Sequence, residues 1–300
     1  MRPLPLADPR VVAVGDNVVD CYTADGVMYP GGNCVNVSVY AAREGVPTAY
    51  IGAVSDDAAG RLLRSSLAAE GVDVSRLRQE EGWTAYCRIG LIDGDRVFLD
   101  SGKGVSLFTP SADDLDTIAG FDALHVGASS FLDEHLGAFA ERTRVSYDFS
   151  SEFDRASVAE VAEHCFLASF SGGGRSDAEI EDLLAGALDA GASWALVTRG
   201  ERGAVLSDGV RRAVSTPVAT RVVDTLGAGD SFIARTLIGL LRGEELDDLM
   251  AAASISAAFT CTEHGAFGYG APIEITEEAG PPAAVALDHQ THPLAEGEFR

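Results

Sequence analysis

The sequence predicts an α/β protein with a mostly parallel central sheet, helices on both of its faces and a small β-sheet lid. Short apolar runs alternate with helical patterns that end at a glycine, which is typical of βαβ units in a parallel sheet. Two stretches, 18–30 and 82–105, interrupt this alternation and show no helical period. The chain of 300 residues is long enough for one large core with a small added element.

The first part of the chain contains two strand–helix pairs. The run within 10–16 is apolar and rich in valine, as expected for a strand buried on both faces, and 48–55 has the same character. Helices are expected over 34–45 and 57–71, because each amphipathic stretch ends at a glycine. The segment 82–105 then alternates around the turn sequence DGD, which predicts a hairpin. With 18–30, this hairpin is expected to form a small antiparallel flap over the main domain.

The second part continues the alternation. A helix is expected over 177–191, and a strand-like run at 218–223 precedes a further helix through 232–241. Four other apolar runs are expected to be strands of the main sheet: 123–129, 144–150, 164–170 and 193–200.

We expect one domain over 1–276 that contains both lid segments. The tail over 277–300 is rich in Pro, Ala and acidic residues, and we expect it to be loosely ordered.

Composition excludes several classes of partner. The net charge of −24 argues against nucleic acid and against anionic membrane surfaces. A bound nucleotide would therefore need local devices such as helix N-terminal amides and a divalent cation. No run approaches the roughly 18 apolar residues of a membrane helix, and the N-terminus has no signal core, so we expect a cytoplasmic protein. The five scattered cysteines predict reduced thiols rather than disulfides or a zinc site.

The segment DTLGAGDSF, 224–232, is the strongest functional signal. Gly227 and Gly229 let the backbone approach a ligand, and the amides of Ala228, Gly229 and Asp230 would point at an anion at the start of a helix. Asp230 would repel that anion, so it is better explained as the base that takes a proton from an attacking hydroxyl. The alternative is that Asp230 only caps the helix.

A second motif supports the catalytic interpretation. GGNCVNV places Gly31, Gly32 and Asn36 near the N-terminus, and the D-T-x-G-A-G-D pattern of 224–230 follows far along the chain. The ribokinase-like family has two such motifs in this order and at this separation. Over roughly 11–270 the sequence resembles the ribokinase-like (PfkB) carbohydrate kinases. Within that family, GDNVVDCY, GGNCVNVSVYAAREG, DGDRVF, YDFSS and DTLGAGDSFIA look like segments of fructoselysine 6-kinases.

The resemblance implies an ATP- and Mg²⁺-dependent sugar kinase with a ribokinase-like fold. Its acceptor would be a primary hydroxyl, with the 6-hydroxyl of fructoselysine or a related fructosamine as the best match. Asp230 would be the base, and Gly227, Ala228 and Gly229 would form the anion hole. Two alternatives stay open: another kinase of the family (fructokinase, ribokinase or nucleoside kinase), or a catalytically impaired sugar-binding regulator. A homodimer through the lid is a further expectation from the family.

Sugar-binding candidates cluster near the first strand. Asp16 and Asp20 could accept hydrogen bonds from sugar hydroxyls or from a fructosamine ammonium, or could only form Asx turns. Gly31 and Gly32 would let the chain pass close to the sugar, and Asn36 offers both a donor and an acceptor. For Asn33 we expect a helix N-cap, and Asp148 could meet the ligand or cap the next segment of the chain.

Nucleotide-binding candidates come from the second half of the chain. Thr198, Gly200 and Gly203 in TRGERG match a nucleotide-binding turn of the family, although the segment alone reads only as a strand-end loop. Thr225, like Asp224, either contacts phosphate or only shapes the turn before Gly227, Ala228 and Gly229, which we call the cradle. His264 is expected to be solvated or packed rather than catalytic.

Two features depart from the family pattern. The N-x-x-E motif that helps to organise Mg²⁺ is replaced by ASFSGGGRSDAE, in which Asp177 or Glu179 could substitute through water. Arg235 stands where the family often has a small residue. The metal ligands therefore stay unassigned.

Overall fold

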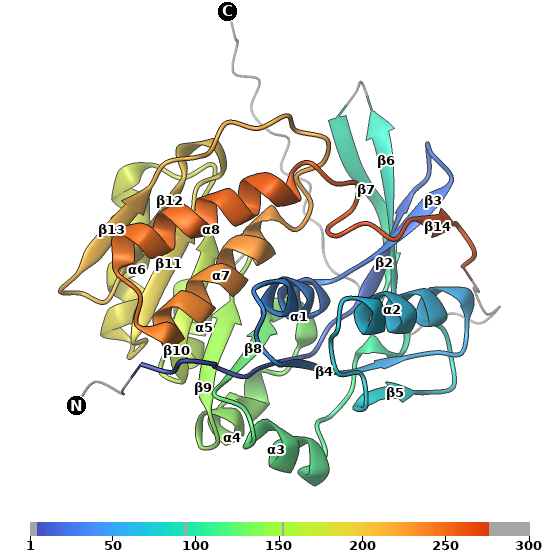
Figure 1. Ribbon diagram of the computed structural model, residues 1–300, viewed down its shortest axis with the longest axis horizontal. Coiled ribbons are helices and arrows are strands. Elements are labelled where there is room, and N and C mark those ends of the chain that lie inside the picture. Colours follow the sequence, from blue (N-terminus) through green and yellow to red (C-terminus); the bar gives the residue numbers. More distant parts are fainter. Residues whose placement is uncertain (1–4, 93–94, 152, 276–300) are drawn as a thin grey trace, which may run out of the picture.

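The structure is a computed structural model that describes residues 5–92, 95–151 and 153–275. It confirms the predicted α/β fold, with a large, mostly parallel sheet between helices and a second, smaller sheet (Figure 1). No helix in this part of the chain has the length and apolarity of a membrane span. The tail expected over 277–300 lies outside the described residues.

The large sheet carries the core. Its strands are β1 (Val11–Val14), β4 (Thr48–Val54), β5 (Leu77–Gln79), β8 (Ala123–Gly127), β9 (Arg144–Asp148), β10 (Cys165–Ser171), β11 (Trp194–Thr198), β12 (Ala204–Ser207) and β13 (Arg212–Ser215). Within the described residues it has nine strands, in the order β13-β12-β11-β10-β9-β8-β1-β4-β5. The pairs from β11 to β5 are parallel, and β12 and β13 add an antiparallel edge. The carboxyl ends of the parallel strands therefore meet at one edge, where ligands bind in such sheets.

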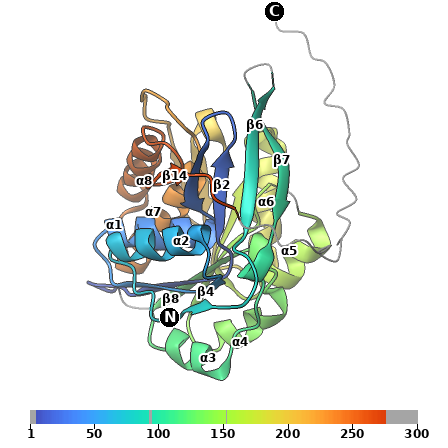
Figure 2. The same ribbon diagram turned by 90° about the vertical axis from the view of Figure 1, so that its right-hand side faces the viewer.

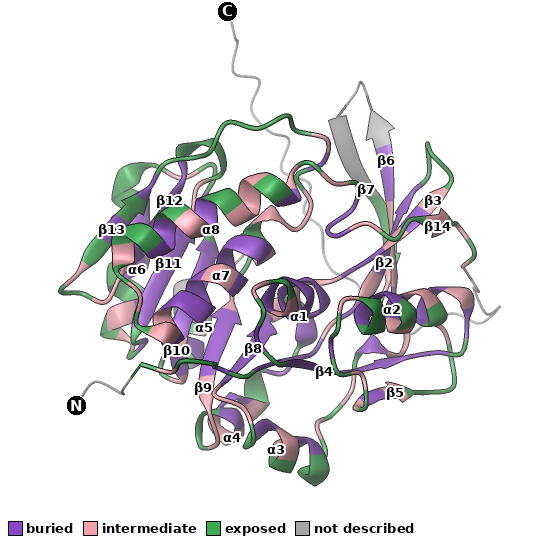
Figure 3. Cartoon of the chain, viewed as in Figure 1, coloured by how far each residue is buried: buried purple, intermediate pink, exposed green. Residues whose placement is uncertain are grey.

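Helices cover both faces of this sheet (Figure 2). One face is covered by α1 (Asn33–Arg43), α2 (Ala58–Ala69), α7 (Ala228–Arg242) and α8 (Leu246–Thr260). The other is covered by α3 (Ala112–Ile118), α4 (Leu136–Ala140), α5 (Arg155–Ala162) and α6 (Asp177–Asp189). Strand side chains alternate between the two cores: Val11 and Ala13 face the first, Val12 and Val14 the second. Burial on both sides explains why these strands are apolar throughout (Figure 3).

The second sheet stands over the carboxyl edge of the first (Figures 1 and 2). Its strands, in spatial order, are β14 (Ala271–Pro272), β3 (Val27–Gly31), β2 (Val18–Tyr22), β6 (Tyr86–Ile92) and β7 (Asp95–Gly102). Both segments predicted to interrupt the main domain lie in this sheet, and β6 and β7 form the predicted antiparallel hairpin. The first two turn residues, 93–94, lie outside the described residues.

The strand predicted at 218–223 is wrong. Val218 and Val222 lie in an exposed loop, which pairs with no strand among the residues that the structure describes. The end of the loop is held instead by the carbonyl of Cys261, which accepts hydrogen bonds from the amides of Val223 and Asp224. The loop therefore runs beside the end of α8 before it reaches the glycine-rich segment.

The packing of α7 generates a stability prediction. Leu237 is fully buried in the core that α7 shares with α1 and α8. We expect Leu237→Ala to lower the free energy of unfolding by about 2–5 kcal/mol, because it removes apolar contacts and leaves a cavity. Val210→Ala, at a side chain that is 91% exposed, should change it by less than about 0.5 kcal/mol. Urea unfolding of both variants measures the difference, and equal effects would contradict this packing.

Candidate active site

A cavity of about 180 Å³ opens at the carboxyl edge of the large sheet, between the ends of β8 to β11 and the start of α7. Five of its lining residues matter for the chemistry: Asn33, Asp148, Thr198, Gly229 and Asp230. They come from α1, from two strand ends and from the first turn of α7. The topology thus brings together chain segments that are far apart in the sequence.

The first turn of α7 is shaped by two glycines with different roles. Gly227 is the N-cap, with a left-handed φ of 78°. A Cβ at this position would lie 2.5 Å from the Tyr40 hydroxyl oxygen and 2.7 Å from the Ala266 Cβ, so only glycine fits. At Gly229, a Cβ would meet nothing within 4 Å, because this residue faces the open cavity. The first glycine fixes the turn, and the second leaves room for a ligand.

Some backbone N–H groups in the first turn of α7 are free to bind a ligand. The Ala228 amide donates to the Thr225 carbonyl at 3.3 Å. Within the described residues, the amides of Gly229 and Asp230 donate to no carbonyl, and no side chain caps the helix. Two free N–H groups at the start of a 15-residue helix, together with the positive end of its dipole, form an anion-binding arrangement.

Asp230 is the third residue of α7, so the alternative that it caps the helix does not hold. Its carboxylate is instead held by two amides from α1. Asn33 Nδ2 donates to Asp230 Oδ1 at 2.8 Å, and Asn36 Nδ2 donates to Asp230 Oδ2 at 2.6 Å. The carboxylate is therefore oriented at the wall of the cavity, beside the free amides.

The electrostatics of the site are dominated by partly buried carboxylates. Burial raises the pKa of Asp230 to about 8, the carboxylates of Asp148 and Asp16 raise it too, and the two asparagine donors oppose the shift. Burial likewise raises the pKa of Asp148 to about 6. A proton, or a cation in the cavity, would relieve the repulsion between these groups.

The residues of the GGN segment take unexpected roles. The predicted N-cap role of Asn33 is wrong, because Gly32 is the N-cap. The carboxylate of Asp16 caps the start of α1 instead: it accepts a hydrogen bond from the backbone N–H of Asn33 at 2.8 Å. It also accepts one from Ser130 Oγ at 3.0 Å. Because Asp16 takes this task, the Asn33 side chain is free to reach the two carboxylates of the site. The role of Asp16 as a sugar ligand stays a prediction.

Asp20 lies on β2, in the lid, and is buried. A Cβ on Gly31 would collide with its Oδ2, so glycine at 31 is needed for this close approach. Burial raises the pKa of Asp20 to about 7, and the charges of Asp224 and Asp16 add to the shift. Within the described part of the chain, no protein group donates a hydrogen bond to this carboxylate. Asp20 is therefore a buried acceptor that suits a donor on a substrate.

The lid is also tied directly to the cradle. Tyr22, on β2, donates to Asp224 Oδ2 at 2.6 Å, and Asp224 accepts from the amides of Leu226 and Gly265. Asp224 thus shapes the loop that leads into α7. Thr225 follows, with an exposed side chain and with its carbonyl bonded to the Ala228 amide.

Of the three residues predicted to form a nucleotide-binding turn, one lines the cavity and two do not. Thr198, at the end of β11, lines the cavity with Asp230. Gly200 and Gly203 belong to the turn that joins β11 to β12, and they do not line it. A Cβ on Gly203 would collide with the Ser215 carbonyl, so this glycine has a packing reason of its own.

The residues considered for the missing motif lie elsewhere. Glu179 caps α6 through Ser176, and Asp177 pairs with Arg199 and Arg202 at 3.7 and 3.3 Å. No cluster of three or more metal-ligating side chains occurs among the residues that the structure describes.

The other two unusual residues also lie outside the cavity. Arg235 forms ion pairs with Glu44 at 3.3 Å and Glu244 at 2.6 Å, so it has a structural role. His264 is exposed and stacks on Tyr29.

Two polar residues of the site escaped prediction. His125, on β8, is fully buried and hydrogen-bonded to the Asn33 side chain, and it stands in no recognisable motif. Ser146, on β9, lies within hydrogen-bonding distance of the other ring nitrogen of His125. Both side chains are hidden in apolar strands, where sequence patterns carry no signal for a polar network.

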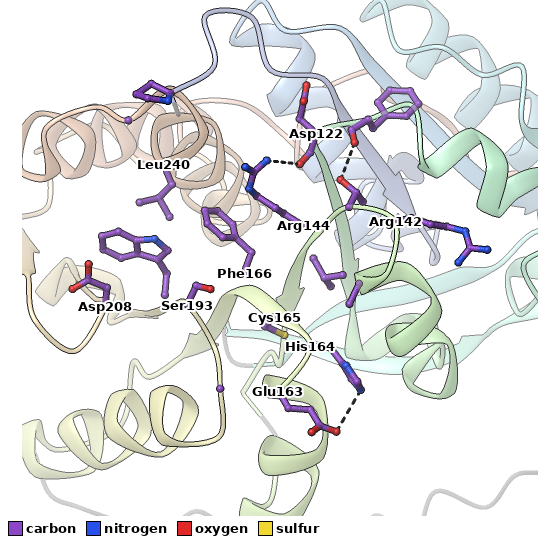
Figure 4. A pocket seen from close by; sticks show the side chains of 18 of the residues that line it. Asp122, Arg142, Arg144, Glu163, His164, Cys165, Phe166, Ser193, Asp208 and Leu240 are labelled. Carbon is purple, nitrogen blue, oxygen red and sulfur yellow. Dashed lines mark hydrogen bonds and ion pairs between the residues drawn. The ribbon is translucent and has the colours of Figure 1, made fainter. Parts of the chain in front are cut away.

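A larger cavity, of about 1300 Å³, lies at the opposite, amino-terminal edge of the sheet (Figure 4). Two of its arginines are already engaged: Arg144 donates to the Asp122 carbonyl, and Arg211 pairs with Asp208. None of the predicted site residues lines it. The smaller cavity at the carboxyl edge is therefore the candidate active site.

The chain is similar to known proteins over most of its length. The family model described as pfkB family carbohydrate kinase matches residues 9–272. The chain is 37% identical over 273 residues to the fructosamine kinase FrlD of Bacillus subtilis (strain 168), covering 89% of this chain and 96% of that protein. It is 34% identical over 261 residues to the fructoselysine 6-kinase of Escherichia coli (strain K12), covering 86% and 99%.

Among solved structures, the fold is similar to that of Arabidopsis thaliana ribokinase complexed with ribose and ATP. The TM-score is 0.75 at 21% identity, with coverage of 86% of this chain and 94% of that one. This likeness confirms the predicted ribokinase-like fold.

The raised pKa of Asp230 generates a prediction for stability against pH. At low pH the carboxyl is neutral in both folded and unfolded chains and makes no difference. Between about pH 4 and pH 8 the unfolded chain ionises first, so the buried group increasingly destabilises the fold. We expect the stability difference between Asp230→Asn and the unsubstituted protein to move in favour of the variant across this interval. Urea midpoints at several pH values measure it, and a constant difference would contradict the raised pKa.

Proposed function

The chain belongs to the pfkB family of carbohydrate kinases, and on that premise we propose that it transfers the γ-phosphoryl group of ATP to the 6-hydroxyl of a fructosamine such as fructoselysine. Membership in this family bears out the resemblance read from the two glycine motifs. One observation carries the catalytic part: the carboxylate of Asp230, oriented by Asn33 and Asn36, stands beside free amides at the start of α7.

In the proposed reaction Asp230 acts as the general base. Its ionised carboxylate accepts the proton of the attacking 6-hydroxyl while that oxygen bonds to the γ-phosphorus and ADP leaves. The amides of Gly229 and Asp230, with the helix dipole, stabilise the charge on the transferring group. Gly227 holds the turn, and the Ala228 amide can join the anion hole by giving up its long bond to Thr225.

The acceptor would lie under the lid. Asp20 offers a buried carboxylate to sugar hydroxyls or to the substrate ammonium, which a fructosamine carries and a plain ketose lacks. An ammonium would stabilise the ionised form of Asp20. Gly31 and Gly32 would let the chain approach the sugar. The names of the two relatives, a fructosamine kinase and a fructoselysine 6-kinase, support this choice of acceptor.

The nucleotide would lie across the cradle toward α8. Four exposed apolar side chains on the loop before the cradle and on α8 suit an adenine ring: Val218, Val222, Ile255 and Phe259. The Ser231 and Ser256 hydroxyl oxygens are 2.8 Å apart, so this part of α8 adjoins the start of α7. Thr198 would face the phosphates. The Arabidopsis ribokinase with this fold was solved with ATP, which supports ATP as the donor.

The site suits Mg²⁺ held with the nucleotide. Mg²⁺ is commonly bound by one or two carboxylates together with substrate phosphates and water, which agrees with the lack of a larger ligand cluster in the described chain. Asp148 is the best candidate, because its carboxylate lines the cavity beside Asp230 and a carboxylate oxygen is a ligand that Mg²⁺ prefers. When bound, the ion would neutralise phosphate charge in a protein whose net charge is −24.

The experiment that tests this function follows ADP release with fructoselysine, fructose, ribose, ketodeoxygluconate and nucleosides as acceptors. We expect fructoselysine to give the highest kcat/KM. Asp230→Asn should lower kcat by about 10²–10⁴-fold, because it removes the base and keeps the shape. The matched control is Asp116→Asn, an exposed aspartate on α3, which should leave kcat unchanged. Preference for another acceptor would sink the substrate assignment, and full activity of Asp230→Asn would sink the mechanism.

A further inference from the structure

A chain of hydrogen-bonded polar side chains leads from the interior of the sheet to the carboxylates of the site. Ser146 Oγ lies 3.0 Å from His125 Nδ1, and His125 Nε2 lies 2.9 Å from Asn33 Oδ1. Asn33 Nδ2 donates to Asp148 Oδ2 at 2.9 Å and to Asp230 Oδ1 at 2.8 Å. We propose that His125 is a positioning residue, which fixes the Asn33 carboxamide and thereby holds Asp148 and Asp230 in place for phosphoryl transfer.

Only one arrangement of protons satisfies this chain. The two N–H groups of the Asn33 amide face two carboxylates, so its carbonyl oxygen must accept. His125 therefore donates from Nε2, and its Nδ1 accepts from the Ser146 hydroxyl. Burial lowers the pKa of His125 to about 3, which keeps the ring neutral, as this arrangement requires. Every polar group in the chain then has a partner.

The anchor of the chain is rigid. His125 and Ser146 are both 0% exposed, and they are paired residues on the adjacent parallel strands β8 and β9. Gly127, two residues along β8, supports the same side chain sterically, because a Cβ there would collide with Asn33 Oδ1. Strand β8 thus holds the Asn33 side-chain amide by a hydrogen bond from His125, and at Gly127 it leaves the room that this amide needs.

This anchor bears on the reaction because the two carboxylates repel each other. The Asn33 amide bridges them with its two N–H groups and so allows them to share one wall of the cavity. Without His125 the amide loses its fixed acceptor contact and the bridge loosens. A base displaced by about 1 Å can lower the rate about 10²-fold. We therefore expect the loss to fall on kcat rather than on the affinity for ATP.

The test is a double-mutant cycle on the full chain, with ATP and the best acceptor of the wild type. His125→Leu should lower kcat by about 10–100-fold and change the KM for ATP by less than about 2-fold. Asn33→Ala should lower kcat at least as much. Because His125 acts through Asn33, the double variant should be no slower than Asn33→Ala. His125→Gln keeps an N–H donor and should recover part of the rate. His164→Leu, at the far edge of the sheet, is the control and should keep wild-type kcat.

A second readout does not depend on turnover. ¹⁵N NMR of the wild type should show a neutral His125 ring protonated at Nε2, and this proton resonance should shift in Asn33→Ala. The proposal rests on Asp230 being the base, and this spectrum tests the role of His125 separately from the proposed function. Absence of turnover with every acceptor would reject the function, while the spectrum would still report the tautomer of His125. Multiplied losses in the double variant, or a ring protonated at Nδ1, would overturn the proposal. The NMR measurement also decides if His125→Leu fails to fold.

Discussion

The structure depends on one constraint: the carboxylates of Asp148 and Asp230 line the same cavity, beside the free amides at the start of α7. Asp148 and Asp230 would repel each other in this position without the amide of Asn33 between them and the amide of Asn36 beyond. Burial raises the pKa of both groups, so the fold carries an unfavourable charge arrangement at its site. Such an arrangement suits a base, because a carboxylate with a raised pKa is a stronger proton acceptor once it is ionised.

The surrounding strands, α1 and the lid hold these carboxylates in place despite their repulsion. Parallel strands β8 and β9 hold His125 and Ser146 inside the sheet and end with Asp148 at its carboxyl edge, where α1 places both asparagines. Asp16 caps α1 from the neighbouring strand end, which releases Asn33 for the site. The lid sheet adds Asp20 from above and is tied to the loop before α7 by the Tyr22–Asp224 hydrogen bond. Asp230, the free amides of the turn before it and Asp20 are thereby fixed relative to one another by short, local contacts.

Sequence patterns predicted those parts of this arrangement that leave a local trace. Apolar strands, glycine-terminated helices and the turn at Gly227 follow from periodicity and backbone geometry, and the fold follows from their order. The strand expected at 218–223 is wrong because its apolar residues, such as Val218 and Val222, stand exposed in a loop. Asn33 was misread as a cap because a distant carboxylate, Asp16, performs that task. His125 left no trace, since its role depends on which side chain another segment places against it.

The central claim is that ionised Asp230 takes the proton from the acceptor hydroxyl. The pH dependence of kcat/KM tests it most directly, with ATP and fructoselysine as substrates. The account predicts that kcat/KM falls as the pH is lowered, with a midpoint well above the 3.8 of an ordinary aspartate, because protonation of the buried carboxyl removes the base. A rate that stays constant down to the ordinary aspartate range would contradict it.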